Sequence, residues 1–307
     1  MNNTLQTTER SLPDWFETSL EAPCQPGETT VDGCKINFLT WGEKGKPGLV
    51  LLHGSNANLE WWRFIAPMLS DHFRVVAMDS SGSGNSGWRE QYSGAMFAQE
   101  VMAVAEAAGL GDKPYVAGHS FGGFATLEAG HLHGGELGGV ILVDFAVQPD
   151  AMRDEFLEMR AERLKAPLRP TRVYLDKAAA LARFRLVPAQ LCKHDFLIDY
   201  IGEQSIREVE GGWTWKFDPA MFRNLNMEDS SKLSQTEKLL NLKCHAAFIM
   251  AAESMDYTAQ AAEYTRELCQ GIIPVFDIPD TYHHLMFDEP IAVAMAIKAT
   301  LLAWNCG

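Results

Sequence analysis

The chain of 307 residues lacks several features that would direct it to a membrane or to nucleic acid. No apolar run reaches the roughly 18 residues that a membrane-spanning helix requires. The first ten residues lack a basic start followed by an apolar stretch, so we expect no signal peptide. Basic residues are outnumbered, 26 against 40 acidic ones, and the formal net charge is −14. This balance argues against nucleic acid and against an anionic membrane surface as partners.

Cysteine is scarce and scattered. The six cysteines form no C-x-x-C motif and no close grouping with histidine; they are Cys24, Cys34, Cys192, Cys244, Cys269 and Cys306. We therefore expect neither a metal site nor a disulfide framework. Reduced, mostly structural thiols fit a cytoplasmic protein. Apolar residues, by contrast, make up 47% of the chain, which is enough for a substantial buried core.

Apolar strand patterns alternate with helical patterns along most of the chain. The predicted strands cover residues 35–41, 48–52, 74–78, 113–117, 139–144, 246–250 and 272–277, and helices are predicted over 93–108 and 292–304. Continuous apolar strands separated by helices indicate a mostly parallel sheet that is covered on both faces. Pro274 in the last strand suits an edge position.

Residues 148–212 interrupt this alternation. They are charged and helical in character, and they contain no convincing core strand. The helical patterns cover residues 150–165 and 176–185. We predict a cap that is inserted between two strands of the main sheet and lies over the strand ends; surface helices without a gating role are the alternative. The core domain would then comprise residues 1–147, with an N-terminal extension over 1–28, and residues 213–307.

A short apolar strand leads directly into residues 118–122, Gly-His-Ser-Phe-Gly, the G-x-S-x-G pattern of a nucleophile elbow. A serine on such a sharp strand-to-helix turn has a strained backbone, and bulky neighbours would collide with it. Gly118 and Gly122 avoid these collisions because glycine has no Cβ. Ser120 is therefore the predicted nucleophile.

A nucleophilic serine needs a base and preorganised N–H donors for the oxyanion. The loop after the last predicted strand offers His283 and His284 as the base, and position alone favours neither. The donors are predicted at the start of the helix that follows the elbow, at Phe121, and in the loop after strand 48–52, at Ser55 or Asn56.

The base in turn needs an orienting acid. Asp144 and Asp256 each stand just past the end of a predicted strand. Either one gives the chain order Ser…Asp…His that is expected for this arrangement. The residues alone therefore leave two candidates for the acid.

Residues 82–87 contain a G-x-G-x-x-G pattern that also occurs in dinucleotide-binding loops. Such a loop must open a helix, whose N-terminus holds the pyrophosphate. Residues 88–92, Trp-Arg-Glu-Gln-Tyr, do not have the pattern of a packed helix. We therefore expect no nicotinamide or flavin at this loop.

With these residues placed, the chain resembles the α/β-hydrolase superfamily over residues 30–304. The matching motifs are His53-Gly54, the Asp79-x-x-Gly82-x-Gly84-x-Ser86 loop, residues 118–123, and His283 seven residues before Pro290. The resemblance implies an eight-stranded, mostly parallel sheet, with a helical cap inserted after strand six at residues 148–212. It also implies that His283 is the catalytic histidine, with His284 at a variable position.

The acid departs from the family pattern. Most members carry it after strand seven in a Gly-x-x-Asp or Gly-x-x-Ser-Asp context. Here alanine replaces that glycine, Ser254 and Met255 stand where the acid would be, and Asp256 is one or two positions late. Some relatives, the haloalkane dehalogenases among them, carry the acid after strand six, where Asp144 stands. We prefer Asp144 and keep Asp256 as the alternative.

The resemblance implies a cofactor-independent serine hydrolase that cleaves a carboxylic ester, a lactone or a thioester through a Ser-His-Asp triad and an acyl-enzyme. The Met, Phe and Trp residues of the cap favour a small, largely apolar substrate. Two alternatives keep the same fold. One is a lyase of the hydroxynitrile-lyase type, which uses the triad for proton transfer, and the other is a receptor-like protein that binds a ligand and turns it over slowly.

Overall fold

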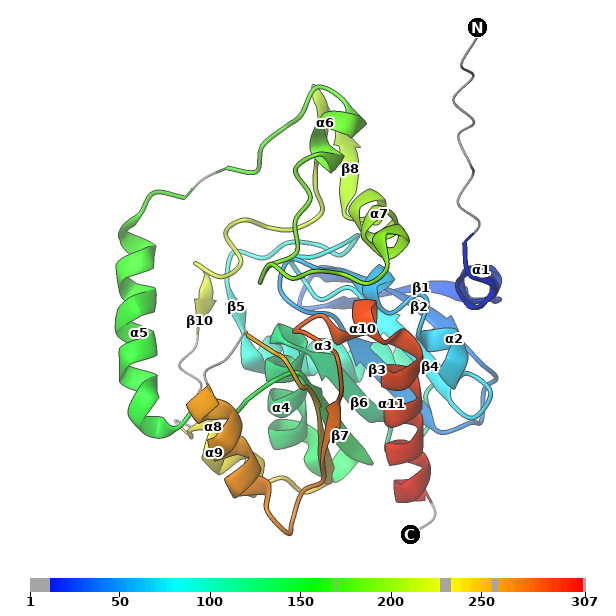
Figure 1. The fold of residues 1–307 in the computed structure, drawn as a ribbon, viewed down its shortest axis with the longest axis vertical. Helices are drawn as coiled ribbons and strands as arrows, with labels where there is room; N and C mark the ends of the chain where they lie inside the picture. Colours follow the sequence, from blue (N-terminus) through cyan, green and yellow to red (C-terminus); the bar gives the residue numbers. More distant parts are fainter. Residues whose placement is uncertain (1–11, 169, 227–232, 256–258, 306–307) are drawn as a thin grey trace, which may run out of the picture.

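The computed structural model describes residues 12–168, 170–226, 233–255 and 259–305 of the chain (Figure 1). Its centre is an eight-stranded sheet in the order β1-β2-β4-β3-β6-β7-β11-β12. The pairs β1–β2 and β2–β4 are antiparallel, whereas the other five pairs are parallel. The strands are β1 (Gln25–Val31), β2 (Cys34–Trp41), β3 (Gly48–Leu52), β4 (Arg74–Met78), β6 (Tyr115–His119), β7 (Gly139–Val143), β11 (His245–Ala251) and β12 (Val275–Ile278). The predicted eight-stranded, mostly parallel sheet is confirmed.

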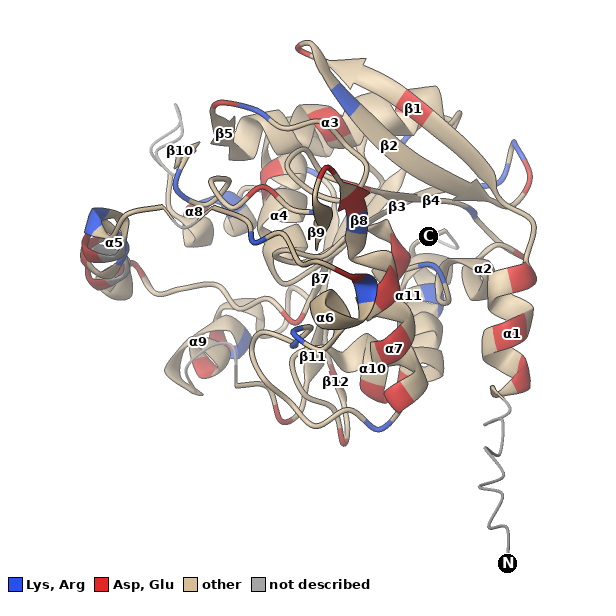
Figure 2. Cartoon of the chain, turned by 90° about the horizontal axis from the view of Figure 1, so that it is seen from above, with Lys and Arg blue, Asp and Glu red and all other residues tan. Residues whose placement is uncertain are grey.

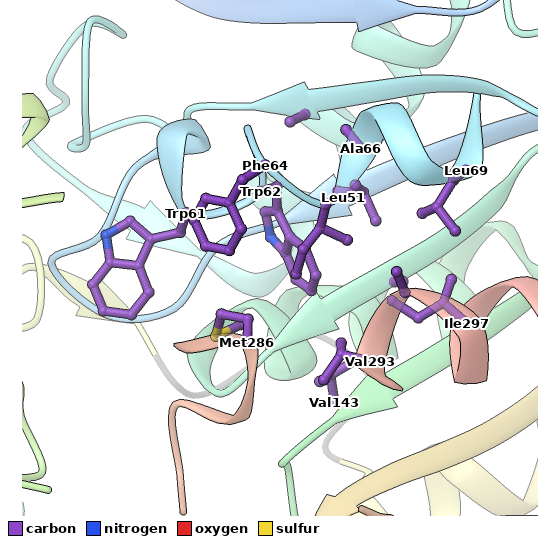
Figure 3. Packing of buried hydrophobic residues seen from close by; sticks show 14 of the residues in the cluster. Leu51, Trp61, Trp62, Phe64, Ala66, Leu69, Val143, Met286, Val293 and Ile297 are labelled. Carbon is purple, nitrogen blue, oxygen red and sulfur yellow. The ribbon is translucent and has the colours of Figure 1, made fainter. Parts of the chain in front are cut away.

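Helices cover both faces of this sheet. The central strands β3, β4, β6 and β7 bury every residue, which explains why their sequences are apolar apart from Arg74 at the start of β4 and His119 at the end of β6. Leu51 of β3 belongs to the apolar cluster on one face, and its neighbour Val50 to the cluster on the other. Figure 3 shows Val293 and Ile297 of the last helix reaching the first face beside Val143.

The helices divide between the two clusters. The first cluster takes residues from α1 (Asp14–Glu21), η1 (Leu59–Trp61), α2 (Ala66–Leu69), α10 (Leu285–Asp288) and α11 (Pro290–Asn305). The second cluster takes residues from α3 (Gly94–Ala107), α4 (Phe121–His133), α8 (Gln235–Leu240) and α9 (Ala259–Cys269). A 3₁₀ turn, η2 (Gly134–Glu136), connects α4 towards β7.

The sheet begins earlier than the sequence pattern indicates. β1 pairs with β2 along its whole length, although its sequence is largely polar and its side chains are mostly exposed or half-buried. An edge strand tolerates such a sequence because only part of it contacts the core. Residues 25–28, which were predicted to belong to an N-terminal extension, are therefore part of the sheet. Ahead of them, α1 buries Phe16 against Phe64 and Phe196.

The segment between β7 and β11 follows the sixth strand of the sheet in chain order, and much of it lies over the ends of the parallel strands (Figure 1). It contains α5 (Asp150–Lys165), α6 (Lys177–Leu181), α7 (Asp195–Gln204), β8 (Ile206–Val209), β9 (Gly212–Trp215) and β10 (Leu225–Asn226), and β10 pairs with β5 (Tyr92–Ser93). The sequence pattern gives α5 its bounds but misses α7 and the β8–β9 hairpin. This hairpin spans residue 212, where the sequence analysis ends the cap. We therefore propose that the cap extends at least to Trp215.

Acidic residues are spread over the surface elements. Figure 2 shows Asp and Glu on α1, α5, α7 and α9; Lys and Arg accompany them on α5 and α9, whereas α1 and α7 carry none. This distribution fits a general surface charge better than one dedicated binding patch. In the described ranges, no helix combines the length and the apolarity that crossing a bilayer requires.

Candidate active site

Ser120 lies on the sharp turn between β6 and α4, with φ 53° and ψ −119°. A non-glycine residue at such a φ is strained, and the surrounding contacts must hold it there. A Cβ at Gly118 would lie 2.1 Å from the carbonyl oxygen of Gly122, and a Cβ at Gly122 would lie 2.6 Å from the carbonyl oxygen of His53. The Ser120 N–H donates to the carbonyl oxygen of Val143 at 2.9 Å. The two glycines thus let the elbow close without steric conflict.

His283 brings the far end of the chain to this serine. It lies in the loop between β12 and α10, and its side chain is 3% exposed. Its Nε2 lies 2.9 Å from the Ser120 Oγ, and its Nδ1 lies 2.7 Å from Oδ2 of Asp144. The three side chains therefore form a continuous hydrogen-bonded chain in the order serine, histidine, carboxylate.

Asp144 follows β7 directly and is fully buried. Its backbone has φ 44°, and its N–H donates to the carbonyl oxygen of Ile249 at 2.7 Å. Oδ1 accepts from the Ala251 N–H at 2.9 Å, and Oδ2 accepts from the Ser254 hydroxyl at 2.6 Å. These donors compensate the burial of the carboxylate and fix its orientation towards His283. The alternative acid, Asp256, lies outside the described residues.

The loop after β3 lies against the elbow. A Cβ at Gly54 would lie 3.3 Å from the Ser120 Cβ, so the backbone here passes directly beside the serine. The loop continues with Ser55, which is half-buried, and Asn56, which is exposed and has φ 54°. Phe121 is the first residue of α4, where a backbone N–H has no acceptor within the helix. Phe121 is therefore adjacent to Ser120 in the chain, and Ser55 directly follows Gly54, whose backbone passes beside the serine.

The His53 ring holds this loop in place. Its Nδ1 bonds to the carbonyl oxygen of Gly54 at 2.8 Å, and its Nε2 accepts from the Ser80 N–H at 3.1 Å. Burial lowers the pKa of His53, with the charge of Asp79 opposing the shift. His53 is therefore a neutral histidine that organises backbone.

The glycine-rich loop at residues 82–87 folds back on Asp79 and does not open a helix. Asp79 accepts from the backbone N–H groups of Leu59 at 2.7 Å and of Asn85 at 2.8 Å. A Cβ at Gly84 would lie 2.1 Å from the carboxyl carbon of Asp79. The next helix, α3, begins at Gly94. The Asp79 side chain thus links the glycine-rich loop after β4 to Leu59, which lies in the segment after the predicted oxyanion donors.

Comparison with known proteins agrees with this architecture. Residues 49–296 match the model of the alpha/beta hydrolase family. The chain belongs to this family. Because the match covers most of the chain, it includes the elbow, the predicted oxyanion loop and the loop that carries His283.

Individual relatives of this α/β hydrolase are distant or partial. A pimeloyl-[acyl-carrier protein] methyl ester esterase of Edwardsiella ictaluri is 40% identical over 99 residues, which span 32% of this chain and 36% of the relative. A serine hydrolase-like protein of Danio rerio is 26% identical over 94% of this chain and 91% of its own length. A solved esterase of M. tuberculosis aligns with a TM-score of 0.73 at 19% identity, over 95% of this chain and 99% of that one. At this identity the structural likeness shows the fold alone.

Two further histidines of this α/β hydrolase lie beside His283. His119, the residue before the nucleophile, donates from Nε2 to the carbonyl oxygen of His283 at 2.8 Å. The ring of His284 packs edge-on against Trp61, with 5.3 Å between the centroids. Burial, reinforced by the charge on His283, lowers the pKa of His119 well below its usual value and that of His284 to about 3. Sequence reasoning missed this cluster, for which the only signal was the adjacency of two histidines to predicted catalytic residues.

The segment between β7 and β11 contacts the loop that carries His283 through Gln190. Its Oε1 accepts from the His284 N–H at 2.8 Å, and its Nε2 donates to Oδ2 of Asp288 at 3.1 Å. The same carboxylate oxygen accepts from the Tyr282 N–H at 2.9 Å. One side chain of the inserted segment thus bonds to the backbone next to the candidate base and to the carboxylate that accepts from the Tyr282 N–H.

The neutral state of His284 predicts a loss of stability in acid. The unfolded chain takes up a proton on this residue below about pH 6.5, whereas the folded protein does so only near pH 3, so the free energy of unfolding falls as the pH drops through that interval. Between pH 7.5 and 5.5, His284 alone is expected to contribute a loss of about 1.4 kcal/mol. Urea unfolding of the wild type and of His284→Phe at both pH values measures this share. An equal pH dependence in the two proteins would contradict it.

Proposed function

We propose that this protein is a cofactor-independent serine hydrolase that cleaves carboxylic esters through an acyl-enzyme. The observation that supports this most strongly is the hydrogen-bonded chain from Ser120 through His283 to Asp144, built on a strained elbow. In the proposed mechanism His283 removes the hydroxyl proton as the serine attacks the carbonyl carbon. The imidazolium then protonates the leaving alcohol, and water activated by the same histidine releases the acid.

The oxyanion is proposed to bind to the N–H of Phe121 and to that of Ser55 or Asn56. These groups are fixed to the helix start and to the loop that passes the serine, so they need no reorganisation when charge develops. Asp144 is proposed to hold His283 in the tautomer that leaves Nε2 free to accept the proton, and to stabilise the imidazolium.

The surroundings of the elbow support an apolar acyl group as substrate. Phe121 is half-buried, and its ring lies 5.5 Å from that of Phe124 and 5.1 Å from that of Phe222, measured between centroids. Phe222 follows the β8–β9 hairpin in the chain and is 38% exposed, so the three rings come from both the core and the inserted segment. The methyl ester esterase among the relatives supports a carboxylic ester as the substrate class.

A panel of p-nitrophenyl esters of increasing acyl length tests the proposal, with a lactone and a thioester beside them. We expect turnover of the esters, with kcat/KM rising from acetate to medium-length acyl groups. Phe222→Ala is expected to reduce this increase in kcat/KM, because it removes one of the three aromatic rings near the elbow. Cleavage of a cyanohydrin without turnover of any ester would favour the lyase alternative. Near-zero turnover together with ligand-dependent protection of the cap in hydrogen exchange would favour the receptor alternative.

A further inference from the structure

Three buried histidines converge behind the elbow. His119 comes from the end of β6, and His283 and His284 come from the loop before α10. One ring nitrogen from each lies within 4.8 Å of a ring nitrogen of the other two. Each residue is 1–2% exposed. We call these three residues the histidine cluster.

Unpaired nitrogens in this cluster are available for a ligand. Within the described part of the chain, Nδ1 of His119 has no hydrogen-bond partner, and the His284 ring has none besides a weak contact with the backbone of Pro188. A buried polar atom without a full hydrogen bond is unfavourable, so a ligand that binds to such an atom removes this penalty.

The surroundings also resemble those of metal-binding histidines. Such a histidine usually donates its other ring N–H to a carboxylate or to a backbone carbonyl, which fixes the ring and its tautomer. His283 faces the Asp144 carboxylate with Nδ1, and His119 donates from Nε2 to the His283 carbonyl oxygen. Asp144 also supplies negative charge behind the cluster, which would stabilise a bound cation.

We propose that the histidine cluster binds a divalent transition-metal ion such as Zn²⁺ and that the bound ion blocks the proposed hydrolysis. Zn–N bonds of about 2.0–2.1 Å place tetrahedral ligand nitrogens roughly 3.3 Å apart, so the rings must approach one another by up to about 1.5 Å. The Ser120 Oγ, 2.9 Å from Nε2 of His283, or a water completes the four ligands.

The bound ion would inhibit because it would occupy the ring nitrogen that serves as the proposed base. The ion takes the lone pair on Nε2 of His283, which otherwise accepts the proton of Ser120. The hydrogen bond between these residues is then lost, and the serine keeps its proton. The inhibition rests on the proposed function, whereas binding of the ion does not.

The test compares the wild type with His284→Phe, which keeps an aromatic ring against Trp61 but removes a ligand. The control is His72→Asn, which changes an exposed histidine outside the cluster. Ester hydrolysis is measured against Zn²⁺ in a non-chelating buffer, and EDTA is then added. Mg²⁺, which prefers oxygen ligands, replaces Zn²⁺ in a parallel series. Binding of Co²⁺ is followed by its visible absorption, which reports nitrogen ligation in the absence of turnover.

We expect Zn²⁺ to inhibit the wild type and His72→Asn equally, EDTA to restore activity, and Mg²⁺ to have no effect. His284→Phe is expected to weaken both Zn²⁺ inhibition and Co²⁺ binding by more than about 100-fold. Loss of a group that only hydrogen-bonds to a metal ligand already lowers metal affinity by about 10- to 100-fold, and His284 is itself a proposed ligand. The melting temperature of each variant is recorded, and His284→Gln replaces His284→Phe if the latter does not fold.

The outcomes separate this proposal from the proposed function. Equal inhibition in the wild type and the His284 variant, or no Co²⁺ spectrum with the wild type, would overturn the metal site while leaving hydrolysis intact. A Co²⁺ spectrum that depends on His284, in a protein without ester turnover, would retain the site and overturn the hydrolase.

Discussion

Ser120→Ala is expected to lower kcat for the best ester of the panel by about three to six orders of magnitude. The substitution removes the attacking oxygen, and the activity that remains comes from substrate binding and the oxyanion donors alone. Alanine keeps the Cβ and fits the same backbone, so the fold is expected to stay intact. Steady-state kinetics with active-site titration of the wild type measures the loss.

Ser70→Ala is the matched control for this variant. Its hydroxyl donates to the carbonyl oxygen of Pro67 on α2, far along the chain from the elbow, so its removal is expected to leave kcat unchanged. Ester turnover by Ser120→Ala at more than a tenth of the wild-type rate, in a preparation free of contaminating esterases, would exclude Ser120 as the nucleophile.

Ser120→Gly separates the chemistry of the serine from its strain. Glycine adopts φ 53° and ψ −119° readily, so this variant releases strain of about 1–3 kcal/mol. Glycine also adds unfolded-state entropy worth about 0.5–1 kcal/mol. We therefore expect Ser120→Gly to be as inactive as Ser120→Ala but to melt at a higher temperature. A lower melting temperature for the glycine variant would show that the elbow stores no strain.

The parts of this protein that the sequence predicts well are the local ones. The elbow can be predicted because five consecutive residues contain both the nucleophile and the glycines that its turn requires. The central strands are readable because burial on both faces demands an unbroken apolar run. β1 cannot be predicted in this way, because an edge strand is only partly buried and its sequence can therefore be polar.

The parts that were missed depend on contacts between distant segments. Gln190 lies 94 residues from His284 in the chain, and nothing in its neighbourhood indicates that it bonds there. His119 and His284 come together only in the folded protein, where the end of β6 meets the loop after β12. Ser254 breaks the usual acid pattern in the sequence, yet in the structure its hydroxyl donates to Asp144. A polar residue that departs from a family motif can thus support a group supplied by another strand.

Asp144→Asn is expected to lower kcat by about four orders of magnitude while the protein stays folded. The amide oxygen can still accept from the Ala251 N–H, which places the amide NH₂ towards His283. His283 must then accept at Nδ1, so its proton moves to Nε2 and the ring can no longer take the proton of Ser120. Ser254 can rotate its hydroxyl to accept from the same NH₂, so the buried site keeps its hydrogen bonds.

Asp256→Asn is compared with Asp144→Asn, because these two aspartates are the alternative candidates for the acid. We expect this variant to keep kcat within about threefold of the wild type, which is well under 1 kcal/mol at the barrier. Both variants are assayed on the same ester, with circular dichroism as the check on folding. A loss of several orders of magnitude in Asp256→Asn, with Asp144→Asn still active, would move the acid to the loop after β11. Asp144 would then be a buried structural carboxylate that happens to bond to the base.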